Sequence, residues 1–219
     1  MSAFIGPIHY WLYGKIKVVS EREEYIFQKA YEMCGSTAEE LRETVWQTYG
    51  APLPDTDLGD LIEHDNIHGW LHRQIQIAES REAAFIKELV DLCGAQNMIE
   101  QSFVEHGKIT GALAKASGKR ASSDAPGIYQ TLGDYYLNGM PCDQGDMIVS
   151  SEEEKVVWEV GDCLQEPNWK RAGVDLALMM SLYQSWVQAF VEEVNADYSF
   201  RKVKQENESV IRYEIYKVK

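Results

Sequence analysis

The clearest candidates for chemistry in this sequence are three of its five histidines, His64, His68 and His106. His64 and His68 lie four residues apart in the segment DLIEHDNIHGWLHRQIQI, and Asp60 lies four residues before His64. In a helix this spacing puts the three side chains on one face, because four residues make about one turn. Two imidazoles one turn apart can bind the same divalent metal ion.

The surrounding pattern predicts that these side chains are buried. On a helical wheel, residues 58–90 form one apolar face that includes His64 and His68, and His106 lies near the middle of the apolar face of residues 96–116. Consecutive helices usually pack side by side, so His106 is expected to approach the other two histidines. Buried imidazoles and carboxylates are costly unless they are paired or bind a metal. We therefore predict a zinc or iron site with His64, His68 and His106 as ligands and Asp60 as a further ligand or an orienting group.

Such a site would suit hydrolysis. A metal with an open coordination position lowers the pKa of its bound water and makes that water a nucleophile. The reaction class expected here is metal-assisted hydrolysis of a small amide or cyclic amidine. Two alternatives stay open for the histidines, namely a buried His/Asp network without metal and a surface position if the helix is turned differently.

Two other hypotheses need no metal. In the first, the chain is a ligand-binding or sensory module whose pocket has an adaptable aromatic and methionine lining. The residues expected to line that pocket are Trp186, Met180, Phe103 and Tyr183. In the second, the chain is an interaction protein that forms a homodimer through aromatic residues of its first helix. These residues are Trp11, Tyr10 and Tyr13.

The composition indicates which classes of binding partner are expected. The 219 residues include 21 Lys plus Arg and 35 Asp plus Glu, and the formal net charge is −14. Such a surface repels phosphate backbones and anionic lipid, so neither nucleic acid nor a membrane is an expected partner. No apolar run approaches the roughly 20 residues that cross a bilayer, and the N-terminal sequence lacks the pattern of a signal peptide. The cysteines are scattered without a CxxC pair, which is typical of reduced thiols in a cytoplasmic protein. They are Cys34, Cys93, Cys142 and Cys163.

Local signals predict the helices that must position these residues. A first helix should begin at Pro7 and end at Gly35, and a capping box of Ser36 and Glu39 should open a second helix that ends at Gly50. Asp57 can cap a third helix, expected to run from Leu58 to about Cys93 with a possible break near Ser80. Later helices are expected over residues 96–117, 128–139 and 175–195, with a loop at KRASSDAPG.

Strands are expected only in the C-terminal part. DMIVSSEEEKVVWEVGDC alternates β-branched and charged residues around an acidic turn, and the tail alternates on both sides of QENES. The predicted fold is therefore α+β, with a helical bundle over residues 1–139 and an antiparallel sheet of about four strands with one long helix over residues 140–219. The two halves are expected to form one compact unit.

From about Gly145 the order of elements resembles the small-molecule-binding domains of the 4-vinyl-reductase type and the related L-2-amino-thiazoline-4-carboxylate hydrolase family. The segments that carry the resemblance are VVWEVGDC, LALMMSLYQSWVQAFVEEV, DYSFRKV and VIRYEIYKV. The resemblance implies an α+β ligand-binding fold. Such domains often hold a cysteine in the last strand, where this chain has Arg212, Tyr213 and Glu214. The resemblance therefore implies no cysteine-dependent chemistry for this chain.

Overall fold

The computed structural model describes residues 5–143, 145–203 and 210–218. Its helices lie mainly in the N-terminal part and a four-stranded antiparallel sheet lies in the C-terminal part, so the predicted α+β class is confirmed. The chain forms two compact units, Met1–Ile99 with Gln165–Met179 and Glu100–Leu164 with Met180–Lys219. These units interleave along the chain, whereas the predicted halves followed one another. No helix among the described residues is long and apolar enough to cross a membrane.

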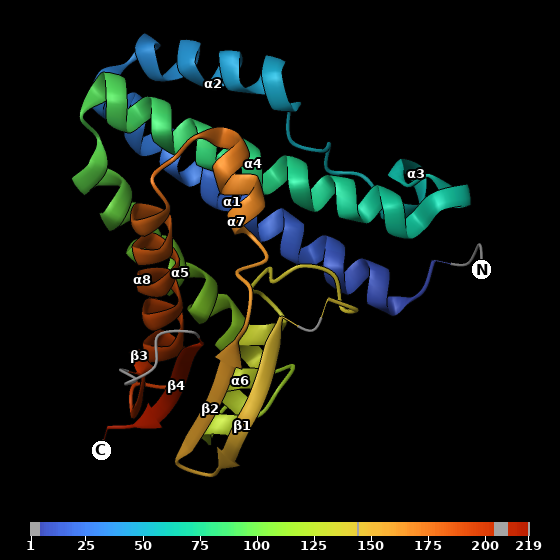
Figure 1. The fold of residues 1–219 in the computed structure, drawn as a ribbon, viewed down its shortest axis with the longest axis vertical. Coiled ribbons are helices and arrows are strands. Elements are labelled where there is room, and N and C mark those ends of the chain that lie inside the picture. The colour runs from blue at the N-terminus through green and yellow to red at the C-terminus, as the bar shows by residue number, and fades with distance from the viewer. Residues whose placement is uncertain (1–4, 144, 204–209, 219) are drawn as a thin grey trace. The chain divides into compact units, whose positions relative to one another are not determined.

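The first unit is helical. Helix α4 is its centre and contacts α1, α2 and α7. Figure 1 shows α1 and α4 side by side, both running away from the end that holds α3, so the two long helices are parallel. The elements are α1 (Pro7–Cys34), α2 (Ser36–Tyr49), α3 (Leu58–Leu61), a short 3₁₀ turn (His64–Asn66), α4 (Ile67–Cys93) and α7 (Glu166–Ala172).

Local signals set most of the helix ends in this unit. Gly35 and Gly50 follow α1 and α2 with φ values of +57° and +93°, which favour glycine because it has no Cβ. The Asp57 side chain accepts a hydrogen bond from Gly59 N–H, as predicted for a cap. The predicted capping box at Ser36 is wrong, because Ser36 is already helical and Gly35 precedes α2 without a side-chain cap.

The predicted continuous helix from Leu58 to Cys93 is also wrong. The chain forms one turn of helix, leaves helical geometry at Ile62 with ψ of 144°, and re-enters at Ile67. Asn66 accepts a hydrogen bond from Gly69 N–H and so caps the start of α4. The predicted break near Ser80 does not occur, since Ser80 lies within α4.

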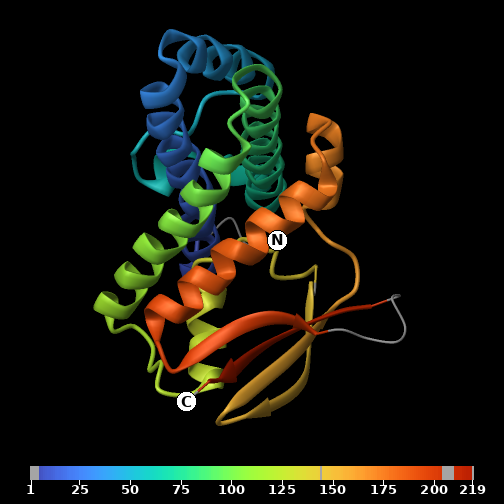
Figure 2. The same ribbon diagram turned by 90° about the vertical axis from the view of Figure 1, so that its left-hand side faces the viewer.

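The second unit combines the sheet with helices (Figure 2). The sheet order is β1-β2-β4-β3, and every neighbouring pair is antiparallel. Helix α6 contacts β1, β2 and β4, and the Tyr129 ring on α6 lies 4.9 Å from the Trp158 ring on β2. The elements are α5 (Gln96–Ser117), α6 (Ala125–Gly133), β1 (Asp146–Glu152), β2 (Lys155–Val160), α8 (Leu176–Val194), β3 (Tyr198–Val203) and β4 (Ile211–Lys217). The residues of α5 up to Ile99 and those of α8 up to Met179 belong to the first unit.

The strands and the helices α5 and α8 confirm the sequence prediction closely. The helix expected at residues 128–139 instead spans Ala125–Gly133, because Asp124 caps it by accepting from Gly127 N–H. Helix α7 was not expected, since its seven residues are too few for a clear periodic pattern. The predicted turn at QENES lies outside the described residues.

Helices α5 and α8 approach closely at two glycines. A Cβ atom added at Gly107 would lie 2.6 Å from the carbonyl oxygen of Trp186, and one at Gly111 would lie 2.8 Å from that of Phe190. Both distances are shorter than a van der Waals contact. The small residues at this spacing therefore allow the backbones of α5 and α8 to touch.

Candidate functional site

His64, His68 and Asp60 do not lie on a buried helix face. All three side chains are exposed. The break between α3 and α4 removes His64 from the face that continues along α4, and its Nε2 lies 3.1 Å from the carbonyl oxygen of Gly59. The surface position that the sequence left open is therefore what the structure has for these residues.

The histidine beside His68 is His9, and not His64 or His106 as predicted. Its Nε2 lies 3.3 Å from Nε2 of His9 on α1, and the Gly6 N–H donates to Nδ1 of His9 at 2.9 Å. Partial burial, and next the electrostatic interaction with His68, lower the pKa of His9. The two imidazoles therefore form a hydrogen-bonded pair, and the lowered pKa favours the neutral form of His9.

His106 belongs to the second unit and is buried. The Trp186 indole donates to its Nδ1 at 3.0 Å, and the Thr110 hydroxyl donates to its carbonyl oxygen at 2.8 Å. These contacts place His106 in a buried polar network that includes an indole and a hydroxyl.

The structure does not bring the four predicted ligands together by any contact that it describes. Within residues 5–143, 145–203 and 210–218, no group of three or more His, Cys, Asp and Glu side chains is arranged to hold a metal ion. The zinc or iron site and its hydrolase chemistry stay predictions that no contact among the described residues supports.

The predicted pocket of Trp186, Met180, Phe103 and Tyr183 corresponds to packed core in the second unit. The side chains of Trp186, Phe103 and Tyr183 are buried, and that of Met180 is half-buried. The Phe103 and Tyr183 rings lie 5.8 Å apart, and Trp186 stacks on Phe190 at 5.4 Å. These rings contact one another, which is how aromatic side chains fill a core.

The aromatic residues proposed for a dimer contact are largely used within the chain. Tyr13 is buried, and the Lys15 ammonium lies 3.8 Å from the centre of a Trp11 ring. Tyr10 is 43% exposed and donates from its hydroxyl to Asp57 at 3.0 Å. The homodimer stays a prediction, with Tyr10 as the most exposed of the three.

The strongest candidate site is a cavity in the first unit, which we call the α1/α4 cavity. Its volume is about 380 Å³, and it lies beside α1, α4, one residue of α2 and the proline-containing turn that follows α2. Apolar and aromatic side chains provide much of the lining, with a smaller number of charged groups among them. The lining residues are Tyr13, Ile16, Lys17, Ser20, Glu21, Glu24, Trp46, Pro52, Leu53, Pro54, Asp55, Gln74, Ala78 and Arg81.

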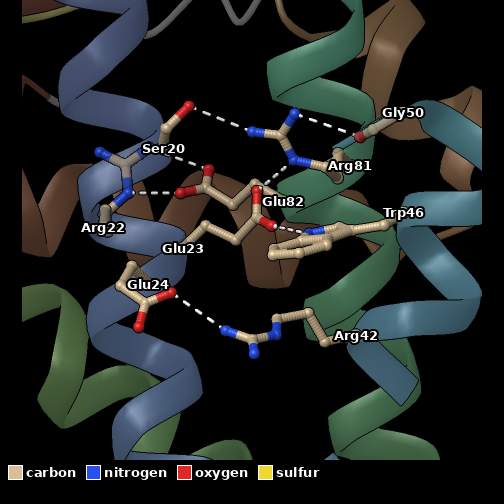
Figure 3. A network of polar contacts seen from close by, with 9 residues as sticks. All are labelled: Ser20, Arg22, Glu23, Glu24, Arg42, Trp46, Gly50, Arg81 and Glu82. Atoms are coloured by element: carbon tan, nitrogen blue, oxygen red, sulfur yellow. Dashed lines mark hydrogen bonds and ion pairs between the residues drawn. The ribbon is translucent and has the colours of Figure 1, made fainter. Parts of the chain in front are cut away.

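A buried network holds Arg81 in the wall of this cavity (Figure 3). Arg81 donates to Glu23 at 2.6 Å, to Ser20 at 3.1 Å and to the Gly50 carbonyl oxygen at 3.4 Å. Trp46 donates to the other oxygen of Glu23 at 2.9 Å. The cavity wall is therefore fixed by hydrogen bonds from α1, α2 and α4 together.

A second buried pair lies beside the first in Figure 3. Arg22 donates to both carboxylate oxygens of Glu82, at 2.7 and 2.9 Å, and the two side chains are 2% and 0% exposed. Each long helix thus contributes an Arg-Glu dipeptide, and each arginine binds the glutamate of the other helix. Two charges of each sign are paired, which is the condition for burying them.

Most of the charged side chains that line the cavity have an ion-pair partner. Lys17 binds Asp55 at 2.9 Å, and Arg42 binds Glu24 at 3.1 Å. Glu21 has no hydrogen bond or ion pair with any residue that the structure describes. Partial burial raises the pKa of Glu21, while Lys17 opposes the shift. Glu21 is therefore the lining carboxylate with most to gain from a positively charged ligand.

Glu79 is a further buried carboxyl in this unit. It accepts a hydrogen bond from Asn168 of α7 at 2.6 Å. Burial raises its pKa from the ordinary 4.5 to about 8, and the bond from Asn168 opposes this shift. At neutral pH Glu79 is therefore largely protonated, and it links α4 to α7.

Sequence reasoning missed the cavity and its network because it searched for histidines. A usable signal was present, since Arg22-Glu23 and Arg81-Glu82 lie within the polar runs SEREE and ESRE, each flanked by apolar residues in a long helix. Charged residues within an apolar helix face must be paired if they are buried.

No protein-family model, no curated protein and no solved structure matches this chain. The resemblance to the 4-vinyl-reductase type and to the thiazoline-carboxylate hydrolase family therefore stays a prediction.

Proposed function

We propose that this chain is a cytoplasmic, metal-free ligand-binding protein whose ligand occupies the α1/α4 cavity. The observation that carries the proposal is the cavity itself. Its volume of about 380 Å³ falls in the range of roughly 300–1,000 Å³ that is usual for small-molecule sites. A reducing compartment is supported by the four cysteines, which are all free thiols.

The lining supports an organic amine as the ligand class. Three carboxylates, those of Glu21, Glu24 and Asp55, line the cavity against two cations, Lys17 and Arg81. An ammonium group beside Glu21 would give that carboxylate its missing partner. The apolar part of the ligand would lie against Trp46 and the Pro52–Pro54 turn.

Three probes of similar shape and different charge test this proposal. Benzylamine, benzyl alcohol and benzoate are each added to the protein, and Tm is measured by thermal unfolding. A ligand that binds only the folded state raises Tm, so benzylamine should raise it most and benzoate least. Glu21→Gln should remove the advantage of benzylamine over benzyl alcohol, while Glu32→Gln, an exposed substitution on the same helix, should preserve it.

A pair of tryptophan substitutions locates the binding site. Gln74 lines the cavity and Gln76 does not, yet both are half-buried on α4. Gln74→Trp should fill the cavity and abolish the response to all three probes, whereas Gln76→Trp should leave it intact. Equal responses in both variants would show that the probes bind elsewhere, and the proposal would then fail.

A further inference from the structure

Two cysteine thiols lie in contact in the first unit. Cys34 is the last residue of α1 and Cys93 is the last residue of α4. Their sulfur atoms are 2.9 Å apart although 59 residues separate them in the sequence. The parallel arrangement of the two helices brings these C-terminal ends together. Both cysteines are half-buried, so each is within reach of a small reagent.

The distance is close to that of a covalent bond. A disulfide has sulfur atoms about 2.05 Å apart, so the two thiols need to approach by only about 0.9 Å. Rotation about the side-chain bonds of two helix-terminal residues can supply a movement of that size. The geometry is therefore ready for bond formation without a rearrangement of the helices.

The two thiols are not equivalent. Cys34 donates to the carbonyl oxygen of Ala30 at 3.2 Å and accepts a hydrogen bond from Cys93. Burial, and next the hydrogen bond from Cys93, raise the pKa of Cys34 to about 11. Cys34 is thus a protonated thiol at neutral pH, and it is poorly suited to make the first attack because the thiolate is the reactive form.

We infer that Cys34 and Cys93 form a reversible thiol–disulfide site, oxidised by a small-molecule disulfide such as oxidised glutathione. Cys93 loses its proton to solvent and attacks one glutathione sulfur, giving a mixed disulfide and one glutathione thiolate. Cys34 then loses its proton and attacks the Cys93 sulfur, which releases the second glutathione. Two protein thiols are oxidised, one small disulfide is reduced to two thiols, and reduced glutathione reverses both steps.

The site joins the ends of the two helices that flank the α1/α4 cavity. This inference does not depend on what that cavity binds. Oxidation should raise the free energy of unfolding, because a cross-link between distant residues limits the freedom of the unfolded chain.

Peptide mapping of the whole protein tests the inference. The protein is equilibrated with oxidised glutathione, free thiols are blocked by alkylation, and the chain is cleaved with trypsin. Cleavage after Lys29, Arg42, Lys87 and Lys108 places Cys34 and Cys93 in separate peptides, 30–42 and 88–108. The expected product is one species in which these peptides are joined, with Tm raised by several degrees and restored by reduced glutathione.

Single substitutions separate the two steps. Cys34→Ser should stop the reaction at the mixed disulfide, so that peptide 88–108 carries glutathione. Cys93→Ser should slow the formation of any glutathione adduct, because burial, the largest cause of the raised pKa of Cys34, is still present in that variant. The exposed Cys142 serves as an internal comparison, because it has no second thiol in contact and should carry glutathione in every variant.

Two outcomes would overturn the inference. One is that, in the unmodified protein, Cys34 and Cys93 are both still free thiols, and so become alkylated, although Cys142 has reacted with glutathione. The other is a stable glutathione adduct on either cysteine of the unmodified protein, since that adduct should be resolved by the neighbouring thiol. Both outcomes are read from the unmodified chain, so they do not depend on whether the variants fold.

Discussion

At the scale of single residues, the first unit is unusual in the number of charges that it buries. Arg22, Glu23, Arg81 and Glu82 are each at most 2% exposed. A buried ion pair loses hydration that its mutual attraction only partly returns, so such pairs often add little net stability. Removing one partner is different, because it leaves an uncompensated charge in the core.

Arg22→Met should therefore destabilise the protein strongly. The buried Glu82 carboxylate loses two charge-assisted hydrogen bonds, and the free energy of unfolding should fall by about 3–5 kcal/mol. The double variant Arg22→Met/Glu82→Leu should recover most of that loss, as measured by urea unfolding. As a control, Lys87→Met breaks only partly exposed pairs and should cost no more than about 1 kcal/mol. A double variant as unstable as the single one would contradict this account.

Glu79 should make stability depend on pH. Its pKa is raised from 4.5 to about 8 in the folded protein, so between these values the folded state binds a proton that the unfolded state has released. Stability should therefore fall as pH rises through this window, by up to about 1.4 kcal/mol per pH unit. Glu79→Gln keeps an oxygen for Asn168 and does not titrate, so its stability should change less over the same range.

Urea unfolding at several pH values between about 5 and 8 measures this difference. Glu32→Gln, on the exposed side of α1, provides the control and should follow the unmodified protein. An identical pH profile for Glu79→Gln and the unmodified protein would show that Glu79 is ionised in the fold throughout this range.

At the scale of elements, the contact between α5 and α8 depends on two glycines. Gly107 and Gly111 lie one turn apart on α5 and face backbone carbonyl groups of α8. A helix interior normally disfavours glycine by about 1 kcal/mol relative to alanine. At this position the close packing of backbones offsets that preference.

Gly107→Ala should destabilise the second unit. The added methyl group would lie 2.6 Å from the Trp186 carbonyl oxygen, and overpacking of this kind costs about 1–3 kcal/mol. Gly14→Ala on α1 is the matched control, because its added Cβ would meet nothing within 4 Å. That substitution should raise stability by up to about 1 kcal/mol. Thermal unfolding of the two variants measures both effects, and a shift in the same direction would argue against the close contact.

At the scale of the whole molecule, the excess of acidic residues should govern the response to salt. With a net charge of −14 the folded chain repels itself more than the expanded chain does. Raising sodium chloride from about 10 to about 150 mM shortens the screening length from roughly 30 to roughly 8 Å. Tm should therefore rise over this range, and potassium chloride should give the same result. A fall in Tm would show that surface ion pairs such as Lys17–Asp55 outweigh the repulsion.

Each of the two units is built from segments that are far apart in the sequence. The chain leaves the first unit after Ile99, returns at Gln165 and leaves again after Met179. The helical half predicted to end at residue 139 therefore lacks α7, whose Asn168 binds the buried Glu79. A change of composition along a chain indicates where strands replace helices, but it does not indicate which segments pack together.

The sequence by itself determined the elements whose ends depend on local chemistry. Pro7, Gly35, Gly50 and Asp57 act within a few residues of the backbone groups that they satisfy, and the α+β class follows from the change of period near residue 146. The break before Ile67 was missed, because the apolar spacing of a helix continues on both sides of it.

Only the tertiary structure decided which polar residues are buried and what they contact. The histidines carried the clearest sequence pattern, yet the break before α4 separates His64 from that helix, and the side chains of His64 and His68 are both exposed. The cavity beside Arg81 and the contact of Cys34 with Cys93 join residues about 60 positions apart. Such contacts depend on the direction and offset of whole helices, which are set by the sum of many weak packing interactions and leave no local signature in the sequence.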